Sequence, residues 1–183
     1  MNKTVIVLVG MPGAGKSTLV DYLATKNIPS VYFGGITVNE VKRRGLEVNE
    51  ANEKMVREEL RANEGLGVMA KRIIPQIEEL WQTNDTVVAD GLYSWTEYKI
   101  FKEKFGSNAV IIAVAAPRSM RHERLACRPI RPLTEEQVTA REYAEIENIE
   151  KGGPIANADY TLVNSKDPQW LIDQLDSVLQ TIN

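Results

Sequence analysis

The sequence contains few of the residues that stabilise or functionalise other protein classes. It has one cysteine, Cys127, and one histidine, His122, among 183 residues. A single cysteine excludes an internal disulfide, which suits a reducing compartment such as the cytoplasm. His122 and Cys127 alone cannot complete a metal site, so we expect structural roles for both.

Long apolar runs and a basic excess are also absent. The run from Val5 to Val9 is shorter than the core of a signal sequence and leads into a glycine-rich segment. No run approaches the roughly 20 apolar residues of a membrane span. The formal net charge is −3, whereas nucleic-acid binders are usually basic. We therefore expect a cytoplasmic protein without membrane or nucleic-acid partners, either a monomer or a homodimer.

Strand-like and helix-like segments alternate along the chain. This alternation predicts a three-layer α/β fold, with a five-stranded parallel sheet covered by helices on both faces. Residues 38–80 exceed an ordinary crossover, so we expect a helical insert there, within a single domain spanning 1–183. The apolar runs expected to form strands are Thr4–Val9, Ser30–Phe33, Thr86–Ala89, Ala109–Ala115 and Tyr160–Val163.

The clearest functional signal follows the first expected strand. The segment GMPGAGKS, from Gly10 to Ser17, matches G-x-x-x-x-G-K-[ST] in full. Glycines let the backbone turn tightly and direct N–H groups toward phosphate oxygens at a helix start. A plain glycine turn is the alternative, but the strand–loop–helix context favours a phosphate loop (P-loop) that binds ATP. Its expected nucleotide-binding residues are Gly10, Gly13, Ala14, Gly15, Lys16, Ser17 and Thr18.

The motif and the expected sheet together predict individual roles for three polar side chains. Lys16 is expected to neutralise the β- and γ-phosphates, and Ser17 to bind Mg²⁺. Asp90 ends the third expected strand, and ligands of open α/β sheets bind beyond such strand ends. There Asp90 could hold Mg²⁺ through water or accept a proton from an attacking hydroxyl. The alternative is a turn-forming or helix-capping aspartate before Gly91.

An arginine-rich segment follows the fourth expected strand. Arg121, Arg124 and Arg128 recur at helical spacing and could share one face. Guanidinium groups bind phosphate oxygens in pairs and keep their charge, so we favour Arg124 and Arg128 as phosphate ligands. The roles of Arg131 and Arg141, and of the basic residues in the insert, stay open. A solvated helix face paired with Glu123, Glu135 and Glu142 is the alternative for the whole segment.

The order of these features resembles the nucleoside monophosphate kinase group. Within that group the chain is most similar to a family of small proteins labelled adenylate-kinase-like or dephospho-CoA-kinase-like. The resemblance is carried by GMPGAGKST (10–18), VKRRGLE (41–47), REELRANEGLGVMAKRIIPQI (57–77), VVADG (87–91) and ADYTLVN (158–164).

This resemblance implies an arginine-bearing lid over about 124–133 and an acceptor-binding insert. It also implies that Thr18 reaches the α-phosphate, that Arg124 packs on the adenine, that Arg128 approaches the phosphates, and that the segment around Asn164 lies near the base. The chain departs from the adenylate kinase pattern at two places. Both arginines that would hold the phosphate of AMP are missing, after Gly34-Gly35 and after Asp90-Gly91.

The sequence therefore predicts an ATP-dependent kinase with a small-molecule acceptor, most simply a nucleotide or nucleotide-like metabolite. Lys16, Asp90, Arg124 and Arg128 are its expected catalytic residues, Ser17 and Asp90 its Mg²⁺ ligands, and Asn164 an additional nucleotide contact. A nucleotide-binding switch or slow ATPase is the main alternative. A third possibility, an RNA or protein acceptor, would require a localised basic groove.

Overall fold

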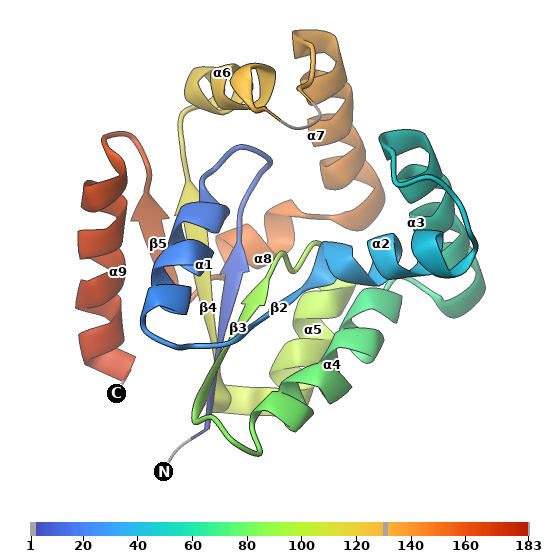
Figure 1. Ribbon diagram of the computed structural model, residues 1–183. Helices are drawn as coiled ribbons and strands as arrows, with labels where there is room; N and C mark the ends of the chain where they lie inside the picture. Colours follow the sequence, from blue (N-terminus) through green and yellow to red (C-terminus); the bar gives the residue numbers. More distant parts are fainter. Residues whose placement is uncertain (1–2, 130–131, 183) are drawn as a thin grey trace.

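Parallel strands at the centre of the molecule confirm the predicted fold class (Figure 1). The computed structural model describes residues 3–129 and 132–182. In this part of the chain one sheet has the strand order β2-β3-β1-β4-β5, with every neighbouring pair parallel. The strands are β1 (Thr4–Val9), β2 (Ser30–Tyr32), β3 (Thr86–Asp90), β4 (Ala109–Ala115) and β5 (Tyr160–Val163).

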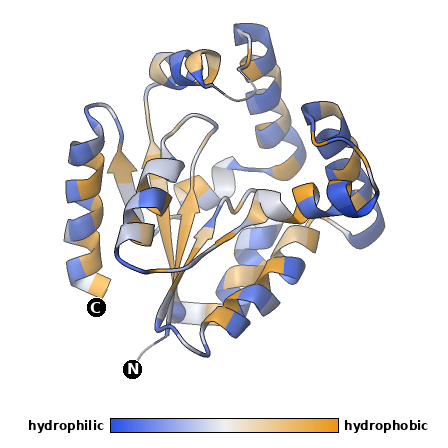
Figure 2. Ribbon diagram, in the orientation of Figure 1, coloured by the Kyte–Doolittle hydropathy of each residue, from blue (hydrophilic) through white to orange (hydrophobic). Residues whose placement is uncertain are grey.

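Both faces of this sheet are buried, which explains why its strands are continuously apolar. Alternate residues of β1 point to opposite faces: Val5, Val7 and Val9 join one core, and Ile6 and Leu8 join the other. The second core is covered by α1 (Lys16–Thr25) and α9 (Pro168–Ile182). Figure 2 shows apolar strands between helices whose outer surfaces are mostly hydrophilic.

The other face is covered by helices that include the expected insert. These are α2 (Phe33–Arg43), α3 (Glu50–Glu64), α4 (Val68–Leu80) and α5 (Trp95–Phe105). The helical segment begins at Phe33 rather than at residue 38, and the second strand ends one residue earlier than predicted. Phe33 is fully buried and its ring lies 5.6 Å from that of Phe101 and 6.3 Å from that of Tyr93. This packing outweighs the low helix propensity of Gly34 and Gly35.

The remaining helices lie beyond the carboxyl ends of β4 and β1 or beside the sheet (Figure 1). They are α6 (Arg118–Cys127), α7 (Glu135–Ile149) and the short α8 (Gly152–Ala156), with a 3₁₀ turn at Gly106–Asn108. Thr134 begins α7 with a capping box to Gln137. Arg131, left open by the sequence, lies outside the described residues. Among the described helices, none is long and apolar enough to cross a membrane.

Candidate functional site

The loop between β1 and α1 has the conformation that its glycines predict. Gly13 and Gly15 have φ angles of 76° and 101°, in the region that side chains disfavour. A Cβ atom on Gly15 would lie 2.0 Å from Nδ2 of Asn164, and one on Gly13 would lie 2.6 Å from the carbonyl oxygen of Arg121. Glycine is therefore required both by the backbone angles and by the close approach of two later segments of the chain.

Those two segments hold the loop from outside. The Asn164 Nδ2 atom donates to the Ala14 carbonyl at 2.8 Å, and Arg124 donates to the Asn164 Oδ1 atom at 3.2 Å. Arg124 also donates to the Gly13 carbonyl at 3.4 Å, and Arg121 to the Pro12 carbonyl at 3.3 Å. The loop is thus held by side chains from α6 and from the end of β5.

The spacing of Arg121, Arg124 and Arg128 allowed all three to share one helix face, but Arg121 does not line the cavity with the other two. It is 8% exposed and forms an ion pair with Glu142 of α7. His122 lies 3.4 Å from the same carboxylate, in agreement with its expected structural role. The side chain of Arg121 therefore positions the loop and α7, whereas Arg124 and Arg128 line the cavity beside the loop. The ion pair with Glu142, rather than the sequence spacing, gives Arg121 a different role from Arg124 and Arg128.

A cavity of about 630 Å³ lies against the loop at the carboxyl ends of the strands. Almost all of the predicted site residues line it, and Gly10 contributes through its carbonyl, which accepts from the Lys16 Nζ atom at 2.9 Å. Among its described lining residues, six are cationic and Asp90 is the only carboxylate. The cationic lining residues are Lys16, Arg124, Arg128, Arg141, Lys151 and Lys166. Three of them, Lys16, Arg124 and Arg128, are predicted site residues. The other predicted site residues in the lining are Gly13, Ala14, Gly15, Ser17, Thr18, Asp90 and Asn164.

In the protein without a bound anion, the surroundings of Lys16 destabilise its charged form. Burial, together with the smaller effect of the nearby Lys151 charge, lowers the pKa of its ammonium group from 10.5 to about 8. Asp90 and Glu145 act in the opposite direction, and Arg141 adds a smaller destabilising contribution. A polyanion entering the cavity would restore the lost stabilisation of the lysine charge.

Asp90 faces the same cavity because of its register in the sheet. It pairs with Leu8 of β1, and alternation along β3 places it on the α1 side, as Val88 is. Its Oδ1 atom is buried and has no hydrogen-bond partner among the residues that the structure describes. Burial raises the pKa of this carboxyl group, and the charges of Lys16 and Lys151 partly oppose the increase. The turn-forming alternative leaves this orphaned oxygen unexplained.

On the Asp90 side the cavity is continued by residues that the sequence analysis did not assign. Lys151 is 2% exposed, forms an ion pair with Glu145, and lies 4.8 Å from the ring centre of Tyr93. Arg141 donates to the other Glu145 oxygen at 3.0 Å. Tyr93 lines the cavity, while Trp95 stacks on Tyr98 with ring centres 4.8 Å apart. Lys151 follows α7 in a glycine-rich segment, and no local motif marks it.

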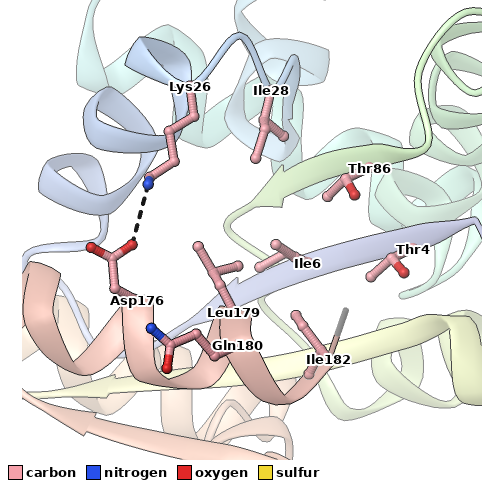
Figure 3. A pocket seen from close by; sticks show the side chains of 9 residues that line it. All are labelled: Thr4, Ile6, Lys26, Ile28, Thr86, Asp176, Leu179, Gln180 and Ile182. Carbon is pink, nitrogen blue, oxygen red and sulfur yellow. Dashed lines mark ion pairs between the residues drawn. The ribbon is translucent and has the colours of Figure 1, made fainter.

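A second cavity, of about 400 Å³, lies at the opposite ends of the strands (Figure 3). Thr4 and Thr86 line it from the starts of β1 and β3, and Ile28 and Leu179 contribute apolar side chains. Lys26 and Asp176 form an ion pair of 3.4 Å across one side. This cavity has balanced charge and lacks the converging backbone N–H groups of the loop, so the loop cavity is the candidate site.

Comparison with known proteins agrees with this geometry. Residues 6–149 match a family model described as AAA domain. A UPF0200 protein from Thermococcus onnurineus is 36% identical over 163 residues, which cover 87% of this chain and 88% of that protein. A UPF0200/UPF0201 protein from Archaeoglobus fulgidus is 32% identical over 179 residues, but the match spans only 54% of that longer protein.

Solved structures with the same fold include kinases. The structure of TT1252 from Thermus thermophilus superimposes with a TM-score of 0.68 at 18% identity, covering 100% of both chains. A shikimate kinase from Bacteroides thetaiotaomicron gives a TM-score of 0.62 at 17% identity, covering 97% of this chain and 98% of that one. These similarities establish a P-loop kinase-like fold. They do not single out the adenylate-kinase-like or dephospho-CoA-kinase-like relationship that the sequence suggested.

Proposed function

The chain belongs to the AAA domain family and to the UPF0200 family, and from this premise we propose that it is an ATP-dependent kinase with a small-molecule acceptor. The observation that carries the proposal is the charge of the loop cavity: six cationic side chains and one carboxylate in a protein of net charge −3. Such a cavity suits a polyphosphate, and its single carboxylate lies where a reacting group would need a base.

The proposed reaction uses the two ends of the cavity differently. Backbone N–H groups of the loop and Lys16 bind the β- and γ-phosphates, and Arg128 adds charge beside them. The acceptor occupies the Asp90 side. Its hydroxyl oxygen bonds to the γ-phosphorus as the bond to the β–γ bridging oxygen breaks, and ADP leaves with that electron pair. The hydroxyl proton passes to the Asp90 carboxylate, whose raised pKa makes it a better base than an ordinary aspartate.

The donor set also suits a magnesium ion. Ser17 offers a hydroxyl at the loop, and the buried Asp90 oxygen has no partner among the described residues. Oxygen ligands of this type, completed by phosphates and water, are those that Mg²⁺ prefers. Bound there, the ion would neutralise phosphate charge. Ser17 would hold it directly and Asp90 through a water molecule, which leaves the Asp90 carboxylate able to accept the proton.

The nucleoside end of the cavity is proposed to lie near Arg124 and Asn164. Lys166 and Pro168 continue the lining in this direction. Because Arg124 and Asn164 are hydrogen-bonded to each other and to the loop, binding of the base here would be coupled to the loop conformation. The resemblance to nucleoside monophosphate kinases supports a nucleotide-like acceptor at the opposite end. It also supports a lid formed by the segment that carries Arg128.

A nucleotide-dependent switch is the alternative from a different functional class. It is favoured by the absence of the two arginines that adenylate kinases use for AMP. The kinase proposal is preferred because the cavity extends past the loop to Tyr93, Arg141 and Lys151, which leaves space and charge for a second ligand. A switch requires only the nucleotide half.

The decisive experiment measures ATP-to-ADP conversion by the purified protein with Mg²⁺. Acceptors are supplied as nucleoside monophosphates, nucleosides, dephospho-CoA and shikimate, each with its own phosphorylated product assayed. We expect one class to accelerate conversion well above the background without acceptor. Nucleotide binding with only slow, acceptor-independent hydrolysis across the panel would favour the switch.

The pKa of Lys16 gives a pH-dependent binding prediction. Below pH 8 the lysine is charged in the free protein, and above pH 8 binding of a polyphosphate must be accompanied by proton uptake. We expect the Kd for Mg-ATP to be flat near pH 7.5 and to rise about tenfold per pH unit above pH 8. Calorimetric titrations between pH 7.5 and 9.5 measure this slope. A Lys16→Met variant should show no such slope, and a flat wild-type profile would contradict the assignment.

A further inference from the structure

We propose that the acceptor carries an anionic group, a phosphate or a carboxylate, and that Arg141 and Lys151 bind it on the Asp90 side of the loop. The inference rests on the proposed kinase function but concerns a separate subsite. The juxtaposition of two buried cations, one shared carboxylate and an aromatic ring supports it.

Lys151 is the central residue of this subsite. Lys151 is only 2% exposed. Lysines are rarely buried to this extent, because burying an ammonium group costs free energy unless the group is fully paired. Its carboxylate partner is Glu145, and the same carboxylate accepts from Arg141 at 3.0 Å. Two cations thus share one glutamate while both line the cavity. The subsite has one more positive charge than its own residues neutralise.

A third buried cation, Arg61 of α3, lies near this subsite together with a second carboxylate, Glu97. The Nε atom of Arg61 is buried, and within residues 3–129 and 132–182 it has no hydrogen-bond partner. The charge of Glu97 acts on it, but one Glu97 oxygen accepts the backbone N–H groups of Tyr93 and Ser94 at 2.8 and 3.0 Å. The other Glu97 oxygen is buried, and no described residue forms a hydrogen bond with it. Burial lowers the pKa of Arg61 and raises that of Glu97, so both charges are poorly stabilised in the free protein.

The subsite is also connected to the reacting groups. Charges on Lys151 and Arg141 act on Lys16, and the charge on Lys151 acts on Asp90. Tyr93 presents its ring to the Lys151 ammonium at 4.8 Å and lines the same cavity as Tyr32. An anion bound between Arg141 and Lys151 would therefore orient the acceptor beside Asp90, with tyrosine rings available to the rest of the molecule.

The test measures anion binding rather than turnover. The protein is first saturated with Mg²⁺ and the β,γ-imido analogue of ATP, which fills the phosphate positions of the loop. Inorganic phosphate is then titrated calorimetrically, and malonate in a parallel experiment as the carboxylate probe. We expect one further site for at least one of the two anions, and the preferred anion identifies the acceptor group.

Matched variants locate that site. Lys151→Met and Arg141→Met are each expected to raise the Kd of the preferred anion about tenfold or more, as loss of a charge-assisted hydrogen bond should. Arg61→Met, which removes charge without a lining group, should raise it less. Lys71→Met and Arg72→Met, on α4 and outside the cavity lining, are the controls and should bind as wild type.

The possible outcomes separate this inference from the proposed function. If Lys151→Met fails to fold, judged by its melting curve and binding of the ATP analogue, Arg141→Met carries the test. Binding of neither anion to the nucleotide-saturated wild type would overturn the inference, as would binding unchanged in all three variants. A purely structural ion cluster predicts that result, together with lower melting temperatures. Anion binding without phosphoryl transfer in the acceptor panel would instead leave the subsite intact and contradict the kinase assignment.

Discussion

Replacing Lys16 with methionine is expected to reduce acceptor-dependent ATP consumption about 10³-fold. The ammonium group lies on the loop, within 2.9 Å of the Gly10 carbonyl, where the β- and γ-phosphates are proposed to bind. Removing one preorganised group that stabilises transition-state charge typically costs about 10²–10³ in rate, and this one also contributes to binding. Steady-state kinetics with Mg-ATP and the best acceptor measure the effect.

The stability of this variant distinguishes a lost function from a damaged fold. Burial lowers the folded-state pKa of Lys16 to about 8, below its ordinary value of 10.5, so below pH 8 the charge destabilises the folded protein. Methionine removes that penalty, and the melting temperature at pH 7 should be unchanged or higher. Lys71→Met, an exposed lysine on α4, is the matched control. Retention of more than a tenth of the wild-type rate by Lys16→Met would contradict the proposed role.

Replacing Asp90 with asparagine is expected to reduce turnover about 10²–10³-fold with little change in ATP affinity, since a positioned general base contributes about 10²–10⁴. Asparagine keeps the shape of the side chain but cannot accept the proton. The change also removes a charge that raises the pKa of Lys16, so the alkaline loss of ATP binding should begin at lower pH. Rates at saturating substrate and the pH profile of the Kd measure the two effects separately.

Asp85→Asn is the matched control for this variant. Asp85 precedes the opposite end of β3 and lies 3.8 Å from Lys3 in a half-exposed ion pair, which contributes little. Because burial already raises the pKa of Asp90, its charge is unfavourable in the free protein, and Asp90→Asn should not lower the melting temperature. A normal rate in Asp90→Asn would restrict Asp90 to a turn-forming role.

The sheet and the phosphate loop could be predicted because their determinants are local. Strands buried on both faces are continuous apolar runs, and Gly10–Ser17 is a contiguous motif whose backbone requirements are visible in its glycines. The sequence predicts the start of the helical segment at residue 38, five residues after the observed start of α2, because Phe33, Gly34 and Gly35 have low helix propensity. Burial of Phe33 against Phe101 decides the conformation, and that contact joins residues far apart in the sequence.

Side-chain partners in the site were harder to predict for the same reason. Pairing with Glu142 is part of the alternative for this segment and is found for Arg121, but the spacing of Arg121, Arg124 and Arg128 does not show which of the three Glu142 binds. Lys151 has no motif around it, and its importance comes from Glu145, Tyr93 and the cavity. The absence of the two arginines of the adenylate kinase pattern predicts an acceptor other than AMP, and this stays a prediction. The sequence alone could not show that cations of α7 and of the turn before α8 line that side of the cavity.

The side chains that hold the phosphate loop have a consequence for biosynthesis. Gly10–Ser17 is synthesised well before the side chains that hold it, which are Arg121 and Arg124 of α6 and Asn164 after β5. A nascent chain that ends before Asn164 contains the complete motif but lacks the side chain that fixes Ala14. The proposed nucleotide pocket is therefore complete only when β5 has joined the sheet, and a bound nucleotide would stabilise chains that extend past Asn164 over shorter ones.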